Sequence, residues 1–60
     1  MFVELDSRRD ADYAVSLEWE RNSGETQIIV ADRGASSLRV FPVLGESAGD
    51  AFRHPFRYAP

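Results

Sequence analysis

His54 is the only histidine in the chain, and it lies in a nine-residue segment, residues 50–58, with three aromatic residues and two arginines. A nucleophilic mechanism needs a base next to the nucleophile and a third group that orients the base. Ser47, Asp50 and His54 have the required types. On a short helix, however, they would form a cap and a surface row, not a triad. We therefore expect no catalytic residues, and a protein that is not an enzyme.

Two pairs of neighbouring acids, Asp10 with Asp12 and Glu18 with Glu20, suggest glycosidase chemistry or a site for a hard metal ion. A solvated polar face explains these acids better, since Glu18 and Glu20 lie side by side on one strand face. With no cysteine and one histidine, the chain cannot build a zinc site rich in these ligands. Its four glycines lack the spacing of a phosphate-binding loop. We expect no metal site and no cofactor.

The residue types of the C-terminal segment favour binding over catalysis. Aromatic residues and arginine are enriched at the energetic centres of protein interfaces. Arginine beside aromatic rings also holds single-stranded nucleic acid, through stacking and phosphate contacts. The alternative is that Phe52 and Phe56 belong to the core and the arginines only face solvent. The residues predicted to bind a partner are Phe41, Arg53, His54, Phe56, Arg57 and Tyr58.

The charge distribution limits the possible partners. The net charge is −3 and the isoelectric point is about 4.9, which disfavours binding to duplex DNA. Residues 1–32 carry eight acidic residues against three arginines, whereas residues 33–60 carry two against four. An acidic front of this kind could mimic DNA and occupy a DNA-binding protein, although chance scatter in a short chain gives the same asymmetry.

Hydrophobic periodicity predicts three strands. Residues 13–20 alternate strictly, with Tyr, Val, Leu and Trp on one face, as in a half-buried antiparallel strand. Residues 26–32 are apolar on both faces and should lie in the middle of the sheet. Residues 36–43 form the third strand, with Leu38 and Val40 on one face and Phe41 on the other. Because Pro42 cannot donate to a ladder, this strand should lie at an edge or end at Phe41.

Turn and cap signals join these strands and end the chain. Gly24 and Gly34 should adopt left-handed conformations in the two hairpin loops. Ser47 with Asp50 resembles a capping box, which predicts a helix over residues 48–53 that ends before Pro55. Arg39 should pair with an acid across the sheet. Residues 56–60 should run extended.

The first twelve residues leave two alternatives open. Residues 2–5 could add a fourth strand, whereas residues 6–12 are polar and read as a loop or a flexible arm. The expected fold is α+β, in one small domain over residues 1–60: a three-stranded antiparallel meander, with the fourth N-terminal strand as an option, followed by one short C-terminal helix.

A chain of 60 residues without disulfides has few means of stabilisation beyond its core and a partner. One short helix can cover only one face of such a sheet. Because a large exposed apolar face usually marks an interface, we expect a homodimer or docking on a larger protein. A single-stranded nucleic acid is the alternative partner. No apolar run is long enough to span a membrane, and we expect a cytoplasmic protein.

The closing residues 54–59, His-Pro-Phe-Arg-Tyr-Ala, resemble the tail of small actinobacterial proteins of unknown function. Those proteins also share a V-x-L-x-W strand, which residues 15–19 match, and a hairpin. The resemblance covers residues 13–59. It implies a bacterial cytoplasmic setting, in line with a chain whose basic residues are all arginine, and it implies no activity.

Overall fold

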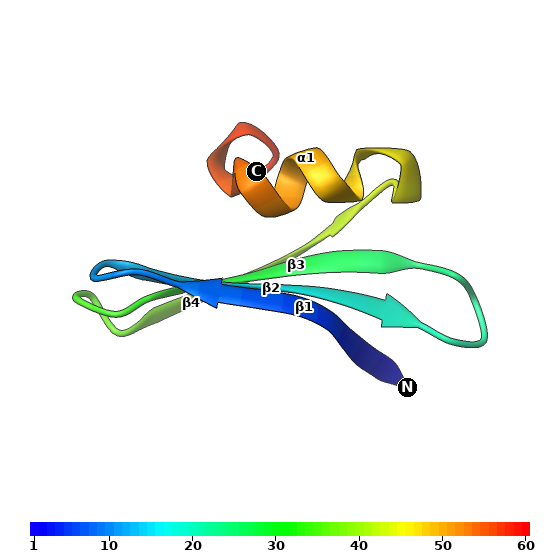
Figure 1. Cartoon of the computed structure of the whole chain (residues 1–60), viewed down its shortest axis with the longest axis horizontal. Coiled ribbons are helices and arrows are strands. Elements are labelled where there is room, and N and C mark those ends of the chain that lie inside the picture. Colours follow the sequence, from blue (N-terminus) through cyan, green and yellow to red (C-terminus); the bar gives the residue numbers. More distant parts are fainter.

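The alternating segment at residues 13–20 is the second strand of a four-stranded antiparallel sheet. The computed structural model describes all 60 residues. The strands follow in the order β1-β2-β3-β4, and the chain then turns back so that a helix lies across one face (Figure 1). The elements are β1 (Phe2–Arg9), β2 (Tyr13–Glu20), β3 (Thr26–Asp32), β4 (Ser37–Val43), the 3-10 turn η1 (Gly45–Ser47), α1 (Ala48–Arg53) and the 3-10 turn η2 (Pro55–Arg57). The α+β meander is confirmed.

The optional N-terminal strand forms and is longer than residues 2–5, so the prediction of a loop from residue 6 is wrong. β1 pairs with β2 from Phe2 opposite Glu20 to Arg9 opposite Ala14, with an irregularity between Glu4 and Asp6. The polar residues 6–9 carry no apolar strand pattern. Their backbone nevertheless continues the pairing with β2, because the amide and carbonyl groups on that edge of β2 would otherwise lack hydrogen-bond partners in the sheet.

One of the two expected left-handed glycines is confirmed. Gly24 has a φ of 78°, but in the second loop the left-handed residue is Ser36, with a φ of 53°, and not Gly34. The Asp32 carboxylate explains the difference, because it accepts hydrogen bonds from the backbone amides of Gly34 at 3.1 Å and Ala35 at 3.0 Å. Because of this local turn, the left-handed conformation falls on Ser36, just before β4, and not on Gly34.

β4 lies at the edge of the sheet, as Pro42 predicted, with Pro42 opposite Gln27 in β3. A proline is tolerated there because its nitrogen can point away from the neighbouring strand. Arg39 lies opposite Val30 and forms no ion pair, so the expected pairing with an acid is wrong.

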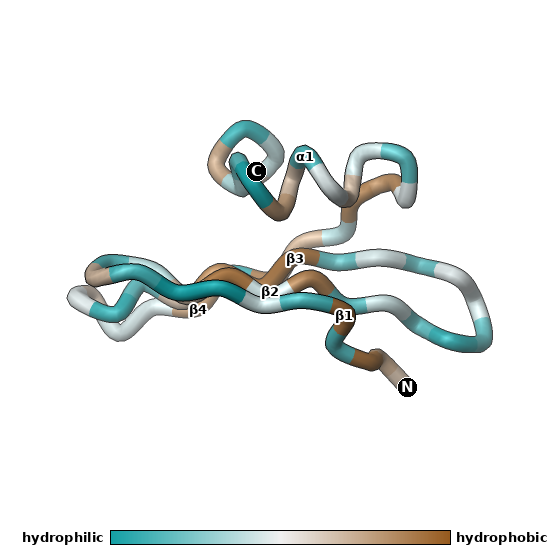
Figure 2. The backbone as a smooth tube through the Cα atoms, viewed as in Figure 1, coloured by the Kyte–Doolittle hydropathy of each residue, from teal (hydrophilic) through white to brown (hydrophobic).

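The core lies between the sheet and α1. Ile28 and Ala51 are fully buried, and the small Ala51 side chain lets the helix approach the sheet closely. Figure 2 shows hydrophobic residues gathered in the central strands and hydrophilic ones at the hairpin ends. The core cluster consists of Val15, Ile28, Val30, Phe41 and Ala51. The sheet face beneath α1 is therefore the closed face, and the opposite face, which no element covers, is called the open face below.

The bounds of α1 agree with the prediction, but its expected cap does not form. Ser47 makes no side-chain capping bond, because its backbone is already helical, with φ −100° and ψ −3°, where η1 runs into α1. The extended tail is also wrong. Pro55 is buried, and residues 55–57 form η2, which folds back beside α1. None of the helices combines the length and the apolar character that a membrane span requires.

Candidate interaction surfaces

Asp50 anchors the C-terminal segment to α1. Its Oδ2 accepts a hydrogen bond from the Tyr58 hydroxyl at 2.7 Å and one from Arg57 Nη1 at 3.3 Å. The Tyr58 bond, followed by the charge of Arg57, lowers the pKa of Asp50 below its ordinary range. The same bond raises the pKa of the Tyr58 phenol. Two of the residues predicted to bind a partner are thus engaged within the chain.

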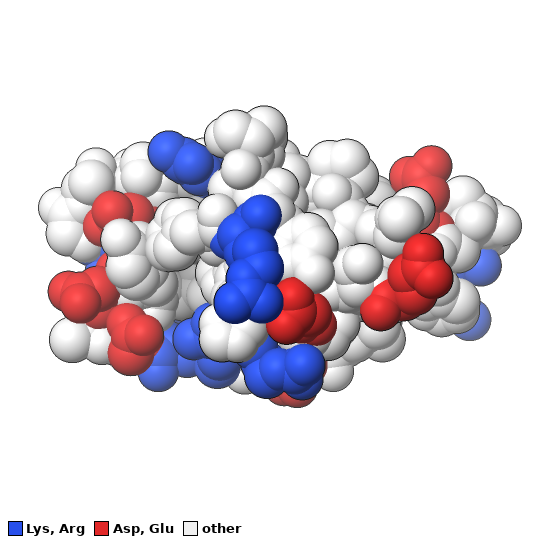
Figure 3. All heavy atoms as spheres, turned by 90° about the horizontal axis from the view of Figure 1, so that it is seen from above, with Lys and Arg blue, Asp and Glu red and all other residues white.

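Phe56 is held from the other side. Its ring meets the ring of Tyr13 edge-on, with 5.0 Å between centroids and 65° between planes, yet 53% of the residue remains exposed. A shallow pocket of about 370 Å³ opens beside it, between the C-terminal segment and the adjoining ends of β1 and β2. Arg53, His54 and Arg57 line this pocket. Figure 3 views the molecule from the helix side, where arginines gather near the centre of the face.

Arg8 completes this region, and the sequence analysis did not identify it. Its Nε and Nη2 donate to the carbonyl oxygen of Phe52 at 3.2 and 2.9 Å, and Nη2 also donates to the carbonyl oxygen of Arg53 at 3.2 Å. Its guanidinium lies 5.5 Å from the centre of the Phe52 ring. Arg8 thus binds carbonyls that the end of a helix leaves without partners. Only the register that sets Arg8 opposite Val15 places it on the closed face.

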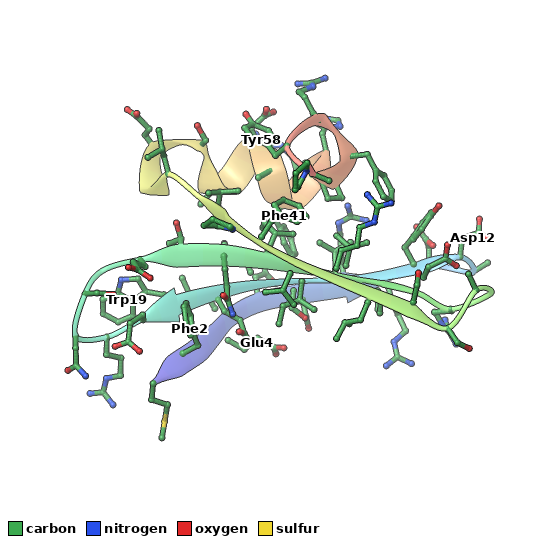
Figure 4. All side chains as sticks on the ribbon, turned by 180° about the vertical axis from the view of Figure 1, so that it is seen from behind. Phe2, Glu4, Asp12, Trp19, Phe41 and Tyr58 are labelled. Atoms are coloured by element: carbon green, nitrogen blue, oxygen red, sulfur yellow. The ribbon has the colours of Figure 1, made fainter.

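The structure divides the predicted partner-binding residues into two groups. Arg53, His54, Phe56 and Arg57 are exposed around the pocket. Tyr58 is half-buried, and Phe41 is 3% exposed in the core (Figure 4). The prediction that Phe41 lies on a partner surface is therefore wrong. The helix α1 covers the face of β4 that carries Phe41, and it leaves exposed the face that carries Leu38 and Val40.

The open face carries two strongly exposed apolar side chains of β4. Leu38 is 66% exposed and Val40 is 52% exposed, beside the half-buried Ile29. The register arranges this face in three rows across the four strands, and Phe2 opposite Glu20 extends it beyond the third row on β1 and β2. The first row is Arg9, Ala14, Ala31, Leu38; the middle row is Ser7, Ser16, Ile29, Val40; the third row is Glu4, Glu18, Gln27, Pro42.

Apolar and polar residues occupy different halves of these rows. The β3–β4 half is apolar except for Gln27, whereas the β1–β2 half is mostly polar. Figure 4 shows Glu4 on the side of the sheet away from α1. Glu4 accepts a bond of 3.4 Å from the Ser16 hydroxyl, and Glu18 Oε1 accepts one of 2.8 Å from Gln27 Nε2. Within the rows the acids thus stand at one end of the strands and Arg9 at the other.

Trp19 ends the apolar face of β2, as the alternation predicted, but lies outside the core cluster and is 38% exposed. It stands opposite Val3 at the edge of the closed face. Phe2, on the neighbouring position of β1, is 37% exposed. This end of the sheet adds partly exposed aromatic surface close to the N-terminus.

No group of three or more histidine or acidic side chains is close enough to hold a metal ion. Every buried side-chain nitrogen or oxygen has a hydrogen-bond partner, so none is left pointing unpaired into a cavity. Comparison of the chain with protein-family models, with curated proteins and with solved structures found no match. The inference about function therefore rests on the two surfaces described above.

Proposed function

We propose that this protein is a non-enzymatic protein–protein interaction module that acts in the cytoplasm through the open face of its sheet. The observation that carries the proposal is the exposure of Leu38 and Val40 next to Ile29, on a face that no other part of the chain covers. Contiguous exposed apolar surface of this kind is costly for a small protein to keep in water, and it usually marks an interface.

The face, and not the free edge of β4, is the surface that we propose for docking. A strand edge binds another chain by extending the sheet, which needs a row of free backbone donors and acceptors. Pro42 removes one donor from this edge, and Arg39 places a charge on it. Proline and charged residues at an edge oppose such pairing. The side chains of Leu38 and Val40 point out of the sheet and remain free to pack against a partner surface.

The C-terminal segment supplies a second surface on the opposite side of the protein. Arg53, His54, Phe56 and Arg57 surround the pocket on the helix side, so a partner there would not compete with one on the open face. This separation favours an adaptor, which holds one partner on each side. The Arg57–Asp50 and Phe56–Tyr13 contacts keep this second surface ordered before a partner arrives.

The experiment is a quantitative co-purification from cells that natively encode the protein. Leu38→Asp combined with Val40→Asp should abolish retention of the partner, because two charges would enter the apolar part of the interface. Leu44→Asp is the matched control, since Leu44 is 69% exposed but lies outside the sheet, before η1. Equal retention by the wild type and both variants would contradict the proposal.

A second candidate function is a nucleic-acid-linked regulator, favoured by the arginines and the exposed Phe56 ring around the pocket. Phe56 offers a stacking platform, and Arg53 lies beside it to contact a phosphate. Asp10 lines the same pocket and opposes an anionic ligand. A fluorescence titration with labelled single-stranded oligonucleotides at two salt concentrations tests it. Binding that Phe56→Ala removes and that weakens at higher salt would support direct contact with nucleic acid, and no binding at low salt would eliminate direct contact but not mimicry of DNA by the acidic front.

A further inference from the structure

We infer that the occupant of the open face is a second copy of this chain, bound face to face about a two-fold axis that runs across the strands over the middle row. This inference deepens the proposed function and rests on it. The observation behind it is the arrangement of residues in the three rows: the face is complementary to its own rotated copy.

The residues in the three rows favour a two-fold axis across the strands over a two-fold axis along them. An axis along the strands would lay β4 over β1 of the second copy, and would set Leu38 against Arg9 and Pro42 against Glu4. An axis across the strands lays β4 over β4 and exchanges the first and third rows. Leu38 then faces Pro42 of the second copy, and Val40 and Ile29 of the middle row face their own counterparts. The apolar half therefore packs on the apolar half.

The same two-fold rotation also brings opposite charges together. Exchange of the first and third rows brings Arg9 over the acids of the second copy, because Arg9 ends the first row and Glu4 ends the third row on the same strand. Facing sheets lie about 10 Å apart and are rotated by about 30°. The long arginine side chain spans this gap and reaches Glu4 or the adjacent Glu18. Two-fold symmetry makes each such pair twice.

The middle row permits the close approach that this arrangement needs. Its polar half consists of Ser7 and Ser16, whose side chains are small, and the first row adds Ala14 and Ala31. No large side chain on these four positions holds the two sheets apart. The result is an eight-stranded sandwich whose inner layer is formed by the two open faces.

The open face is small for a protein interface. Four strands about 4.8 Å apart and seven residues long, at about 3.3 Å per residue, give a flat area of roughly 440 Å². A stable interface buries about 800 Å² of accessible surface on each partner. The dimer is therefore a small one, and we expect a dissociation constant on the order of micromolar.

Dimerisation through the open face leaves the helix side of each copy pointing outward. The two pockets lined by Arg53, His54, Phe56 and Arg57 would then lie on opposite outer surfaces of the dimer. A partner with repeated binding segments could engage both, with a gain in avidity. The dimer would thus present two copies of the helix-side binding surface, where a monomer presents one.

The experiment is a charge exchange measured by sedimentation velocity. Arg9→Glu sets a carboxylate against the acids of the second copy, and Glu4→Arg sets a second guanidinium against Arg9 of the second copy. Each variant alone should dimerise at least about tenfold more weakly than the wild type. An equimolar mixture should recover wild-type affinity, because in the heterodimer the side chains at positions 9 and 4 that face each other are again of opposite charge. Arg21→Glu, in the β2–β3 loop, makes the same charge change away from the face and should dimerise normally.

Far-UV circular dichroism checks that each variant is folded, and Glu18→Arg replaces Glu4→Arg if the latter is not. Single variants that dimerise as tightly as the wild type, or a mixture that gains nothing, would overturn the two-fold arrangement. A monomeric wild type at several hundred micromolar would exclude the second copy as occupant. If Leu38 and Val40 still governed co-purification of another protein in that case, the proposed function would stand without the dimer; if they did not, both would fall.

Discussion

The Tyr58 hydroxyl lies 2.7 Å from Asp50 Oδ2 and ties the end of the chain to the middle of α1. Asp50 accepts a second bond from Arg57, so one carboxylate holds two residues of the C-terminal segment. The helix is only six residues long and has no side-chain cap at its start. This contact therefore contributes to keeping α1 on the sheet and the core closed.

The Tyr58–Asp50 bond should make stability depend on pH at both ends of the scale. The pKa of Asp50 is lowered, so its contribution is complete above the ordinary value of 3.8 and is lost as the pH falls through the lower folded value. The pKa of Tyr58 is raised, so its contribution is complete below 10.0 and is lost as the pH rises through the higher folded value. Thermal unfolding of the wild type should therefore show both losses.

Tyr58→Phe should lower the unfolding temperature by a few degrees at neutral pH and should reduce both pH-dependent losses. Tyr13→Phe is the matched control, because the Tyr13 hydroxyl makes no hydrogen bond and its ring contact with Phe56 is kept. Asp10 and Glu20 also have lowered pKa values, from backbone amides and from the N-terminal ammonium respectively, and they will preserve part of the acid loss. A difference between wild type and Tyr58→Phe that stays constant from acid to alkaline pH would contradict this role.

Arg8 should stabilise the protein through the hydrogen bonds that the two nitrogens of its planar guanidinium donate, and not only through its charge. Arg8→Lys keeps the charge but loses the planar guanidinium, which lies over the Phe52 ring and binds the Phe52 carbonyl through two nitrogens, Nε and Nη2. Because Arg8 is exposed, we expect a modest cost of about 1 kcal/mol in the free energy of unfolding, measured by urea denaturation. Arg21→Lys, with no side-chain bond to lose, should cost nothing, and an equal effect of both changes would exclude the guanidinium contacts of Arg8 as the cause.

The two left-handed residues should respond in opposite directions to substitution. Gly24→Ala introduces a Cβ at a φ of 78° where no atom lies within 4 Å, so its cost is the backbone strain alone, about 1 kcal/mol. Ser36→Gly relieves the strain at a φ of 53° and should stabilise by up to about 1 kcal/mol. Chemical denaturation of both variants checks the signs. A stabilising Gly24→Ala would show that the loop has another conformation.

Ala51 should tolerate no larger side chain, because it is fully buried where α1 crosses the sheet. Ala51→Leu must push the helix away or strain the core, and such overpacking costs about 1–3 kcal/mol. In a domain of this size that is a large part of the total stability. Ala35→Leu, in the exposed β3–β4 loop, is the control. Unchanged urea midpoints for both variants would mean that α1 does not pack as described.

Patterns that local chemistry controls were predictable from the sequence. Alternation in residues 13–20 indicated β2 and its faces, Pro42 indicated the edge strand, and Pro55 indicated the end of α1. The opposite faces of Phe41 and Val40 were also correct. Which of those faces α1 would cover depends on how the chain after β4 turns, and no local pattern encodes that choice. Phe41 was for this reason assigned to a partner surface when it belongs to the core.

Features that depend on distant contacts were missed. Residues 6–9 are polar, and they form a strand only because β2 offers them a partner. Arg8 reaches α1 across 44 residues of sequence, which no spacing within the chain could indicate. Asp32 shifts the left-handed residue from Gly34 to Ser36 through its own turn. In the C-terminal segment, Asp50 and Tyr13 bind residues that composition alone had suggested were free for a partner.

The most direct test of the account is an isotope-filtered NOE spectrum of a sample that mixes labelled and unlabelled protein, which detects only contacts between molecules. We predict intermolecular signals from the methyl groups of Ile29, Leu38 and Val40, and none from the core residues Val15 and Val30. Intermolecular signals that arise only from Phe56 and its neighbours, or no signals at a concentration well above the expected dissociation constant, would contradict the conclusion that a second copy covers the open face.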